Sequence, residues 1–186
     1  MVVADGKRGD VPHTAAAYAA GLFGDGGLGA DAVTVNPLLG IDSLEPWVEA
    51  AAAGGSGLFV LVRTSNPGVA DLLDLETEEG PLHERLARIV AAERRLDGDS
   101  GLSAMGAVIG ATAPERLGRL RELMPRSIFL LPGVGAQGAS ASALGPALGE
   151  HPASILVPVS RGISAAPDPG AAATALRDEL WSLAGG

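Results

Sequence analysis

Residues 2–10 read VVADGKRGD, an apolar start that turns within three residues into a dense run of charges. The first three residues have the pattern of a core strand. Asp5, Lys7, Arg8 and Asp10 then bring opposite charges together directly after it. Parallel-barrel enzymes present catalytic groups in this way at the ends of their strands. A strand followed by a salt-bridged polar turn would give the same pattern, so the stretch predicts one of these two structures.

Apolar strand-like segments and helix-like segments alternate along the rest of the chain. Ser43 has the position of an N-cap residue. The expected strands are 2–4, 32–37, 57–62, 104–112, 127–132 and 154–159, and the expected helices are 13–23, 43–54, 81–96, 114–125 and 171–185. This alternation predicts one parallel sheet covered by helices, in a single α/β domain over residues 1–186. An open doubly wound sheet and a (β/α)₈ (TIM) barrel both satisfy it.

The composition narrows the possible functions. A net charge of −9 argues against nucleic acid or an anionic membrane as a partner. The chain has no Cys, and its three His lie far apart in the sequence, so no metal site is expected. No apolar run is long enough to span a membrane, and no signal-peptide pattern begins the chain. We therefore expect a cytoplasmic protein.

Lys7 is the only lysine among 13 basic residues. A genome that favours arginine codons explains the arginines, but not the one lysine that stands between two carboxylates. An arginine does not release its proton in a protein, whereas a lysine ammonium can act as an acid. The pattern therefore indicates a position that needs a proton donor.

A glycine-rich segment, GVGAQG at 133–138, formally matches the dinucleotide signature G-x-G-x-x-G. It comes late in the chain, and the acidic residue expected about 20 positions later is not matched. In barrels, the loops after the last two strands commonly bind phosphate. Backbone N–H groups of Gly133 and Gly135, the Gln137 amide and the Arg161 guanidinium would form such a site. Taken singly, each of these residues could belong to a turn or a surface salt bridge. Together, at the ends of adjacent strands, they favour a phosphate site in a barrel.

Five segments, taken in order, resemble orotidine 5′-monophosphate decarboxylase, and more specifically its shorter-barrel bacterial subgroup, type 2. The first holds the pattern D-x-K-x-x-D, which alone would be unspecific. The five segments are ADGKRGD (4–10), AVTVNP (32–37), VRTSNPG (62–68), LLPGVGAQG (130–138) and VPVSRGI (157–163). The resemblance implies a TIM-barrel lyase that converts orotidine 5′-monophosphate to UMP in pyrimidine biosynthesis, with no cofactor and no metal.

The resemblance also implies roles for the charged residues near the start of the chain. Lys7 matches the group that protonates C6 of the pyrimidine as carbon dioxide leaves. Asp5 matches the carboxylate that crowds the substrate carboxylate and orders the lysine. Asp10 matches a residue that reaches the active site across a homodimer interface, with Thr14 beside it.

The substrate contacts follow from the later segments in the same way. Ser65 matches the residue that binds the pyrimidine edge. Gln137 and Arg161, together with Gly135 and Gly162, match the phosphate site.

The chain resembles only the last six of the eight strand–helix units of this family. An aspartate that contacts the ribose and a second lysine belong to the first two units, and Leu38 stands where a tyrosine is expected. We expect exposed strand edges, association with other chains and weak turnover. Another D-x-K-x-x-D barrel enzyme, such as a magnesium-dependent keto-gulonate-phosphate decarboxylase or hexulose-phosphate synthase, is an alternative, as is an inactive fragment. The segment VRTSNPG favours the nucleotide enzyme.

Overall fold

The computed structural model describes residues 1–23, 26–135 and 137–185 of the chain. Its main sheet has six strands, all parallel, in the order β1-β2-β3-β6-β7-β8. Each strand therefore pairs with the one that precedes or follows it in this sheet. A doubly wound sheet reverses its strand order partway along, whereas a barrel does not. The sequential order confirms the incomplete barrel and excludes the doubly wound alternative.

The secondary structure alternates as the sequence predicts. The strands of the main sheet are β1 Val3–Arg8, β2 Ala32–Val35, β3 Gly57–Arg63, β6 Ser103–Ile109, β7 Ser127–Leu130 and β8 Ile155–Leu156. The α-helices are α1 Pro12–Phe23, α2 Glu45–Gly54, α3 Leu82–Ala92, α4 Pro114–Leu123, α5 Arg161–Ser164 and α6 Pro169–Leu183. Short 3₁₀ helices are η1 Ile41–Ser43, η2 Pro67–Asp71, η3 Ala141–Ala147 and η4 Pro152–Ser154, and a hairpin joins β4 Glu76–Thr77 to β5 Gly80–Pro81.

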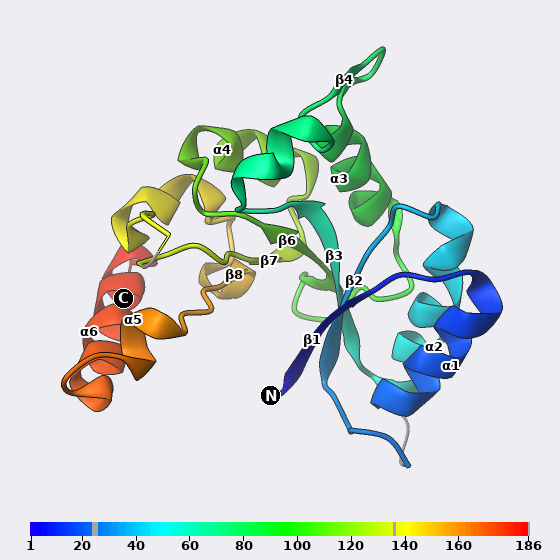
Figure 1. Ribbon diagram of the computed structural model, residues 1–186, viewed down its shortest axis with the longest axis horizontal. Coiled ribbons are helices and arrows are strands. Elements are labelled where there is room, and N and C mark those ends of the chain that lie inside the picture. Colours follow the sequence, from blue (N-terminus) through cyan, green and yellow to red (C-terminus); the bar gives the residue numbers. More distant parts are fainter. Residues whose placement is uncertain (24–25, 136, 186) are drawn as a thin grey trace.

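The helices surround one face of the curled sheet, as Figure 1 shows, with α1 and α2 beside β1 and β2, and α6 beyond β8. The larger apolar cluster lies between this face and the helices, and Trp47, Phe129 and Leu144 are among its fully buried members. A smaller cluster around Phe59 and Val108 covers the opposite, inner face. The two clusters give the sheet the alternation expected of barrel strands, with one set of side chains outside and one inside.

Gly106 shows how tightly the inner face is packed. A Cβ atom at this position would lie 2.6 Å from the ring of Phe59 and 2.5 Å from the carbonyl oxygen of Ile128. Only glycine leaves room there for the phenylalanine ring that fills the inner face.

Several predicted boundaries were wrong in detail. β1 runs through the charged residues to Arg8 instead of ending at Ala4. Helix α2 begins at Glu45, and the Ser43 hydroxyl donates to the carbonyl of Gly40 at 2.6 Å instead of capping the helix. β8 has two residues where residues 154–159 were predicted, since only Ile155 and Leu156 pair with β7. Pro158 has no N–H group to donate to a longer ladder.

Candidate active site

Asp5 and Lys7 form an ion pair on β1. Both residues point to the same side, because alternate residues of a strand share a face. The Lys7 ammonium lies 2.6 Å from each oxygen of the Asp5 carboxylate. The side chains keep 49% exposure for Lys7 and 60% for Asp5, so both charges remain accessible to a ligand. The first charged stretch of the sequence is therefore a strand that carries a pre-formed acid–base pair.

The pairing of β1 with β2 is interrupted at this ion pair. Its register shifts between Ala4 and Arg8, and Lys7 has a φ of 48°, the one positive φ of a non-glycine residue in the described part of the chain. The hydroxyl of Thr34, on β2, donates to the Asp5 carboxylate at 2.8 Å and accepts the N–H of Lys7 at 2.9 Å. Thr34 thus contacts both residues of the pair.

The surroundings of Asp5 favour its ionised form. Partial burial acts to raise the pKa of Asp5, but hydrogen bonds from Lys7 and Thr34 and the Lys7 charge outweigh it. The pKa of Asp5 is therefore lowered from its ordinary value. At neutral pH the site holds a carboxylate beside an ammonium.

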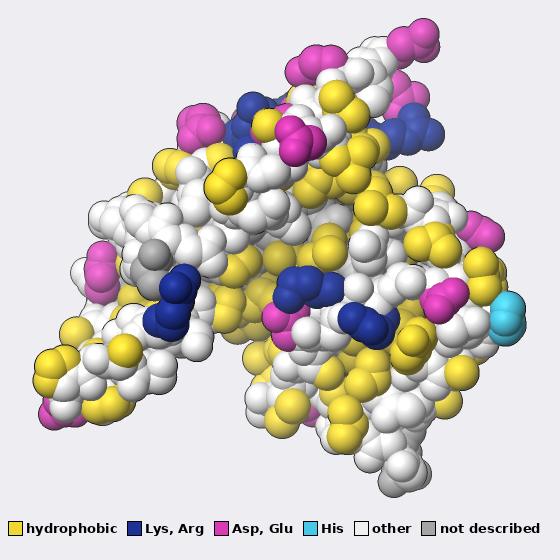
Figure 2. All heavy atoms as spheres, in the orientation of Figure 1, with side chains coloured by type: hydrophobic (Ala, Val, Ile, Leu, Met, Phe, Trp, Pro, Cys, Tyr) yellow, Lys and Arg dark blue, Asp and Glu magenta, His cyan; other side chains and the backbone are white. Residues whose placement is uncertain are grey.

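A cavity of about 1110 Å³ opens on the inner face of the sheet, beside the pair. Figure 2 shows the molecule hollowed between the lobe that carries α5 and α6 and the body of the sheet, with apolar side chains lining much of the hollow. Asp5, Lys7, Ser65 and Gln137 all line this cavity, with Val108 among the apolar residues of its wall. The structure therefore brings together four predicted residues from three distant segments.

Close backbone packing holds Ser65 at the edge of this cavity. A Cβ atom on Gly110 would lie 2.6 Å from the Cα atom of Ser65, so only glycine fits beneath it. Thr112 donates to the Ser65 carbonyl at 3.3 Å. The backbone of Ser65, two residues after the end of β3, is thus held against Gly110 and Thr112.

A buried ion pair lies at the start of the loop that follows β3 and contains Ser65. Arg63, the last residue of β3, binds Asp74 through two hydrogen bonds of 2.9 Å. His83 lies 3.1 Å from the same carboxylate and 2.8 Å from the carbonyl of Leu73. Hydrogen bonds from Arg63, opposed by burial and aided by the Arg63, Arg116 and His83 charges, lower the pKa of Asp74. Sequence reasoning missed this cluster, because its members are far apart along the chain.

The predicted phosphate residues gather around a second cavity, of about 370 Å³. Gln137, Arg161, Gly162 and Gly133 line it, and Asp5 lies in its wall as well as in that of the larger cavity. The two cavities therefore adjoin. A guanidinium and backbone N–H groups of glycines are the donors that bind phosphate.

Gly135 does not line either cavity. Its N–H donates to the carbonyl of Ala139 at 2.9 Å, and its φ of 78° forms a turn. Within the predicted segment 133–138, Ala136 lies outside the described residues. A 3₁₀ helix follows the segment at Ala141–Ala147, whereas a dinucleotide site would need an α-helix N-terminus there. The described residues of the segment, 133–135 and 137–138, form turns, bends and one isolated bridge, and Gln137 lines both cavities.

Asp10 and Thr14 lie away from these cavities. The Asp10 carboxylate accepts the N–H of Val11 at 2.8 Å, just before α1, and Thr14 stands half-buried in the first turn of that helix. Neither residue lines the cavity that holds Lys7 in the same chain. Large apolar side chains are exposed just before α1, on α1 and on the segment after β2, namely Val11, Tyr18, Leu38, Leu39 and Ile41.

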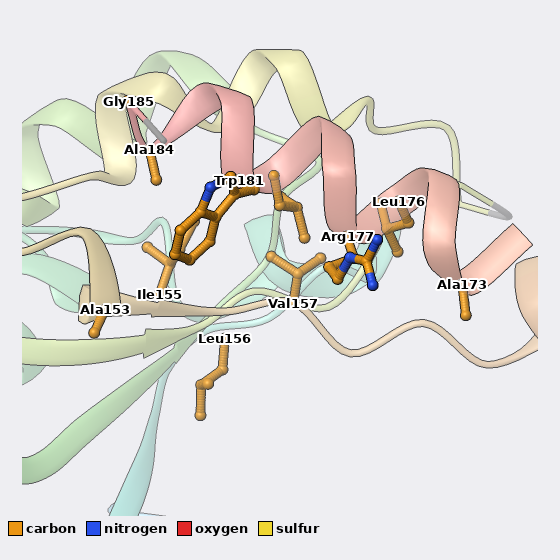
Figure 3. Close-up of a pocket in the computed structure, with 11 residues that line it drawn as sticks. Ala153, Ile155, Leu156, Val157, Ala173, Leu176, Arg177, Trp181, Ala184 and Gly185 are labelled. Carbon is orange, nitrogen blue, oxygen red and sulfur yellow. The ribbon is translucent and has the colours of Figure 1, made fainter.

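A third cavity, of about 770 Å³, lies between β8 and α6. Figure 3 shows Trp181 of α6 facing Ile155 and Val157, while Leu156 points to the opposite side of the sheet. Its lining is apolar apart from Arg177. It holds none of the predicted site residues and no acid–base pair, so we do not assign the chemistry to it.

Neither a metal cluster nor a membrane-spanning helix is found in the described residues. No group of three or more His, Cys, Asp or Glu side chains is arranged to hold a metal ion. None of the helices there has the length and apolar character needed to cross a membrane.

Comparison with known proteins identifies relatives over most of the chain. Residues 1–176 match the model of the orotidine 5′-phosphate decarboxylase / HUMPS family. The orotidine 5′-phosphate decarboxylase of Rhodopirellula baltica is 45% identical over 170 residues, covering 88% of this chain and 56% of that protein. The one of Deinococcus radiodurans is 47% identical over 184 residues, covering 96% and 66%.

Solved structures agree with this assignment. The structure of Leishmania donovani OMP decarboxylase superposes with a TM-score of 0.83 at 37% identity, over 100% of this chain and 69% of that one. This chain thus spans between about half and two thirds of the two sequence relatives, 56% and 66%.

Proposed function

The chain belongs to the orotidine 5′-phosphate decarboxylase / HUMPS family, and on that premise we propose that its cavity binds orotidine 5′-monophosphate and converts it to UMP. The observation that carries the proposal is the Asp5–Lys7 pair, 2.6 Å apart in a cavity shared with Ser65 and Gln137. The activity is that of a carboxy-lyase. The type 2 subgroup and the cytoplasmic location expected from the sequence stay predictions.

Substrate binding would use the two adjoining cavities. The phosphate would lie against Arg161, Gln137 and Gly162 in the smaller cavity, and the pyrimidine would extend into the larger one, toward Ser65. Asp5 lines both cavities, so the bond that breaks would lie beside it. Binding energy from the distant phosphate would then hold the substrate carboxylate against the charge of Asp5.

The chemical step needs only the ion pair. The bond between C6 and the carboxylate carbon breaks and carbon dioxide leaves. The electron pair of the broken bond remains on C6. The Lys7 ammonium stabilises this negative charge and gives C6 its proton. Lysine can do this because its ammonium can release a proton, which an arginine does not. In this scheme the proton donor is a side chain, and no cofactor takes part.

The alternative D-x-K-x-x-D barrel enzymes are not favoured. The two sequence relatives described above, 45% and 47% identical, are both named orotidine 5′-phosphate decarboxylase. Identity at that level supports the nucleotide enzyme over one that acts on a sugar phosphate.

Replacing the proton donor tests the proposal. Lys7→Arg keeps the positive charge but removes the transferable proton, so turnover of orotidine 5′-monophosphate should fall by about 10²–10⁴-fold. Arg85→Lys, a charge-conserving change at an exposed ion pair with Glu79, is the matched control and should leave turnover unchanged. Near-normal turnover in Lys7→Arg would refute the assignment.

We also propose that two copies form a homodimer in which Asp10 and Thr14 serve the partner's site. Exposed apolar side chains near both residues, including Val11 and Tyr18, support this reading. Mixing Lys7→Ala with Asp10→Ala should restore part of the turnover that each variant lacks, because a mixed dimer contains one site with neither substitution. If the subunits exchange and no activity returns, the shared site is wrong.

A further inference from the structure

We propose that Thr34 is a positioning residue for the Asp5–Lys7 pair, its single hydroxyl fixing both the carboxylate of Asp5 and the backbone of Lys7. The inference rests on the proposed function, which gives this pair its chemistry. It extends that function to a buried residue which makes no contact with the reacting atoms.

The burial of Thr34 is the first observation. Its exposure is 0%, and its neighbours on β2, Ala32, Val33 and Val35, are buried and apolar. A buried hydroxyl is unfavourable unless it is hydrogen-bonded. Within the described part of the chain, the hydroxyl of Thr34 makes two hydrogen bonds, both with the ion-pair strand: one to Asp5 and one to Lys7.

The directions of these two hydrogen bonds are fixed by the chemistry of the partners. The backbone N–H of Lys7 can only donate, and the ionised carboxylate of Asp5 can only accept. Thr34 must therefore turn its proton toward Asp5 and a lone pair toward Lys7. Valine, which has the same shape, could do neither.

The backbone of Lys7 provides the second, independent observation. A φ of 48° is uncommon for a residue with a side chain, and it persists only where the surroundings hold it. The β1–β2 ladder is out of register over this stretch, so the N–H of Lys7 lacks the partner that a regular ladder would give it. The Thr34 hydroxyl, at 2.9 Å, takes the place of that partner.

Through these two hydrogen bonds, Thr34 fixes the position of Asp5 relative to Lys7. Without its hydroxyl, the N–H of Lys7 loses its acceptor and Asp5 loses one of the donors that favour its charged form. Besides Lys7 on the same strand, charged groups around Asp5 include Arg161, which lines the smaller cavity. Met1 lines the larger cavity, and its amino group lies 3.8 Å from the Asp31 carboxylate. Loss of the Thr34 hydroxyl would not alter the residues proposed to bind the phosphate.

The test compares Thr34→Val, Thr34→Ser and Ser103→Ala. Ser103→Ala is a matched control: the Ser103 hydroxyl is also buried on a strand and accepts a backbone N–H two residues along, that of Met105 at 3.2 Å. Thr34→Val should lower kcat by about 10²-fold with KM nearly unchanged, because misplacing a reacting group by about 1 Å has that effect. Thr34→Ser, which restores the hydroxyl, should recover most of kcat.

NMR on the free protein decides the same point without turnover. In Thr34→Val the pKa of Asp5 should shift upward and the Lys7 amide should lose protection against hydrogen exchange; Ser103→Ala should change neither. An unchanged Asp5 pKa and unchanged Lys7 protection in Thr34→Val would overturn the proposal, as would a serine variant as impaired as the valine variant. If Thr34→Val does not fold, Thr34→Ala removes the same hydroxyl. Absence of turnover in the unmodified protein would count against the proposed function, and these NMR measurements would still decide the role of Thr34.

Discussion

The two outer strands of the sheet, β1 and β8, each pair with one neighbour, yet their surroundings differ sharply. β1 has six residues and carries Asp5 and Lys7 beside the cavity. β8 has two residues, and one side of it faces an apolar cavity of about 770 Å³ under α6. Charged side chains therefore line a cavity at the β1 edge of the sheet, whereas mainly apolar side chains line the cavity at the β8 edge.

The difference separates two uses of a strand edge. At β1, side-chain hydrogen bonds replace part of the ladder and hold charged groups in the open, so the edge can act on a ligand. Just before β8, Arg121 donates a hydrogen bond to the carbonyl of Ser154. The apolar side chains of α6 face the cavity beside the strand. Substitutions at β1 should therefore change turnover, and substitutions near β8 should change stability or association.

Among the substitutions that compare the two edges, Asp5→Asn on β1 should have the largest effect. The substitution removes the charge that orders Lys7 and crowds the substrate carboxylate, so turnover should fall by about 10²–10³-fold, the scale of losing one preorganised electrostatic group. Asp178→Asn is the matched control on α6, because Asp178 also forms an exposed ion pair of 2.6 Å, with Arg177. The kcat of both variants, measured side by side, checks this. Equal effects would erase the distinction between the two edges.

The same carboxylate predicts a pH dependence. The pKa of Asp5 is lowered in the folded protein, so its charged form persists down to pH values below the ordinary aspartate pKa of about 3.9. The ion pair, and any stability that it contributes, should be complete above that pH and be lost only as pH falls through the lowered value. Titration of Asp5 followed by NMR measures this, and a midpoint above about 4 would contradict it.

An intermediate effect, on the free energy of unfolding, is expected from replacing Arg121, which binds the residue before β8. It is almost fully buried, lies 3.6 Å from the centre of the Phe129 ring, and burial lowers its pKa to about 10. Its guanidinium donates to four backbone carbonyls, those of Ala147, Met124, Ser127 and Ser154. A lysine ammonium cannot reproduce this planar arrangement of donors.

Arg121→Lys should therefore lower the free energy of unfolding by about 2 kcal/mol, on the scale of one lost hydrogen bond to a charged group. Urea unfolding of this variant beside Arg177→Lys, whose arginine is exposed, makes the measurement. A change as small as that of the exposed control would show that the carbonyls find other partners.

The sequence singled out the charged residues that pair on β1, but not the residue that contacts both of them. Asp5 and Lys7 were identified because opposite charges directly after an apolar run are conspicuous. Thr34 was missed, since one hydroxyl in the apolar strand at 32–37 has the pattern of a core residue, and its partners are 27 and 29 positions away. Arg121 was missed for a similar reason: it reads as one of the charges of a polar helix face, although its guanidinium is buried.

The strand alternation predicted a parallel sheet covered by helices, because hydrophobic periodicity is a local property of the chain. It did not separate the barrel from the doubly wound sheet; the glycine-rich and arginine-containing loops after the last two strands favoured the barrel. The ends of elements were harder to predict, since tertiary contacts determine them. The hairpin β4–β5 lies in a charged stretch without strand periodicity and was not expected. The length of β8 depends on pairing with β7, which sequence periodicity does not measure.

The smallest effect on stability is expected from Trp181→Ser, at the apolar edge. Trp181 is 68% exposed, so its replacement should change the free energy of unfolding by less than about 0.5 kcal/mol. Its ring nevertheless faces Ile155 and Val157 across the cavity of β8 and α6 (Figure 3), and an exposed apolar surface of this kind promotes contact with other chains. Light scattering at increasing protein concentration should therefore show weaker self-association in Trp181→Ser. Leu28→Ser is the matched control, because Leu28 is also highly exposed, at 76%, but does not line this cavity. A similar reduction in both variants would mean that general surface hydrophobicity drives association, and that the cavity beside β8 has no special part in it.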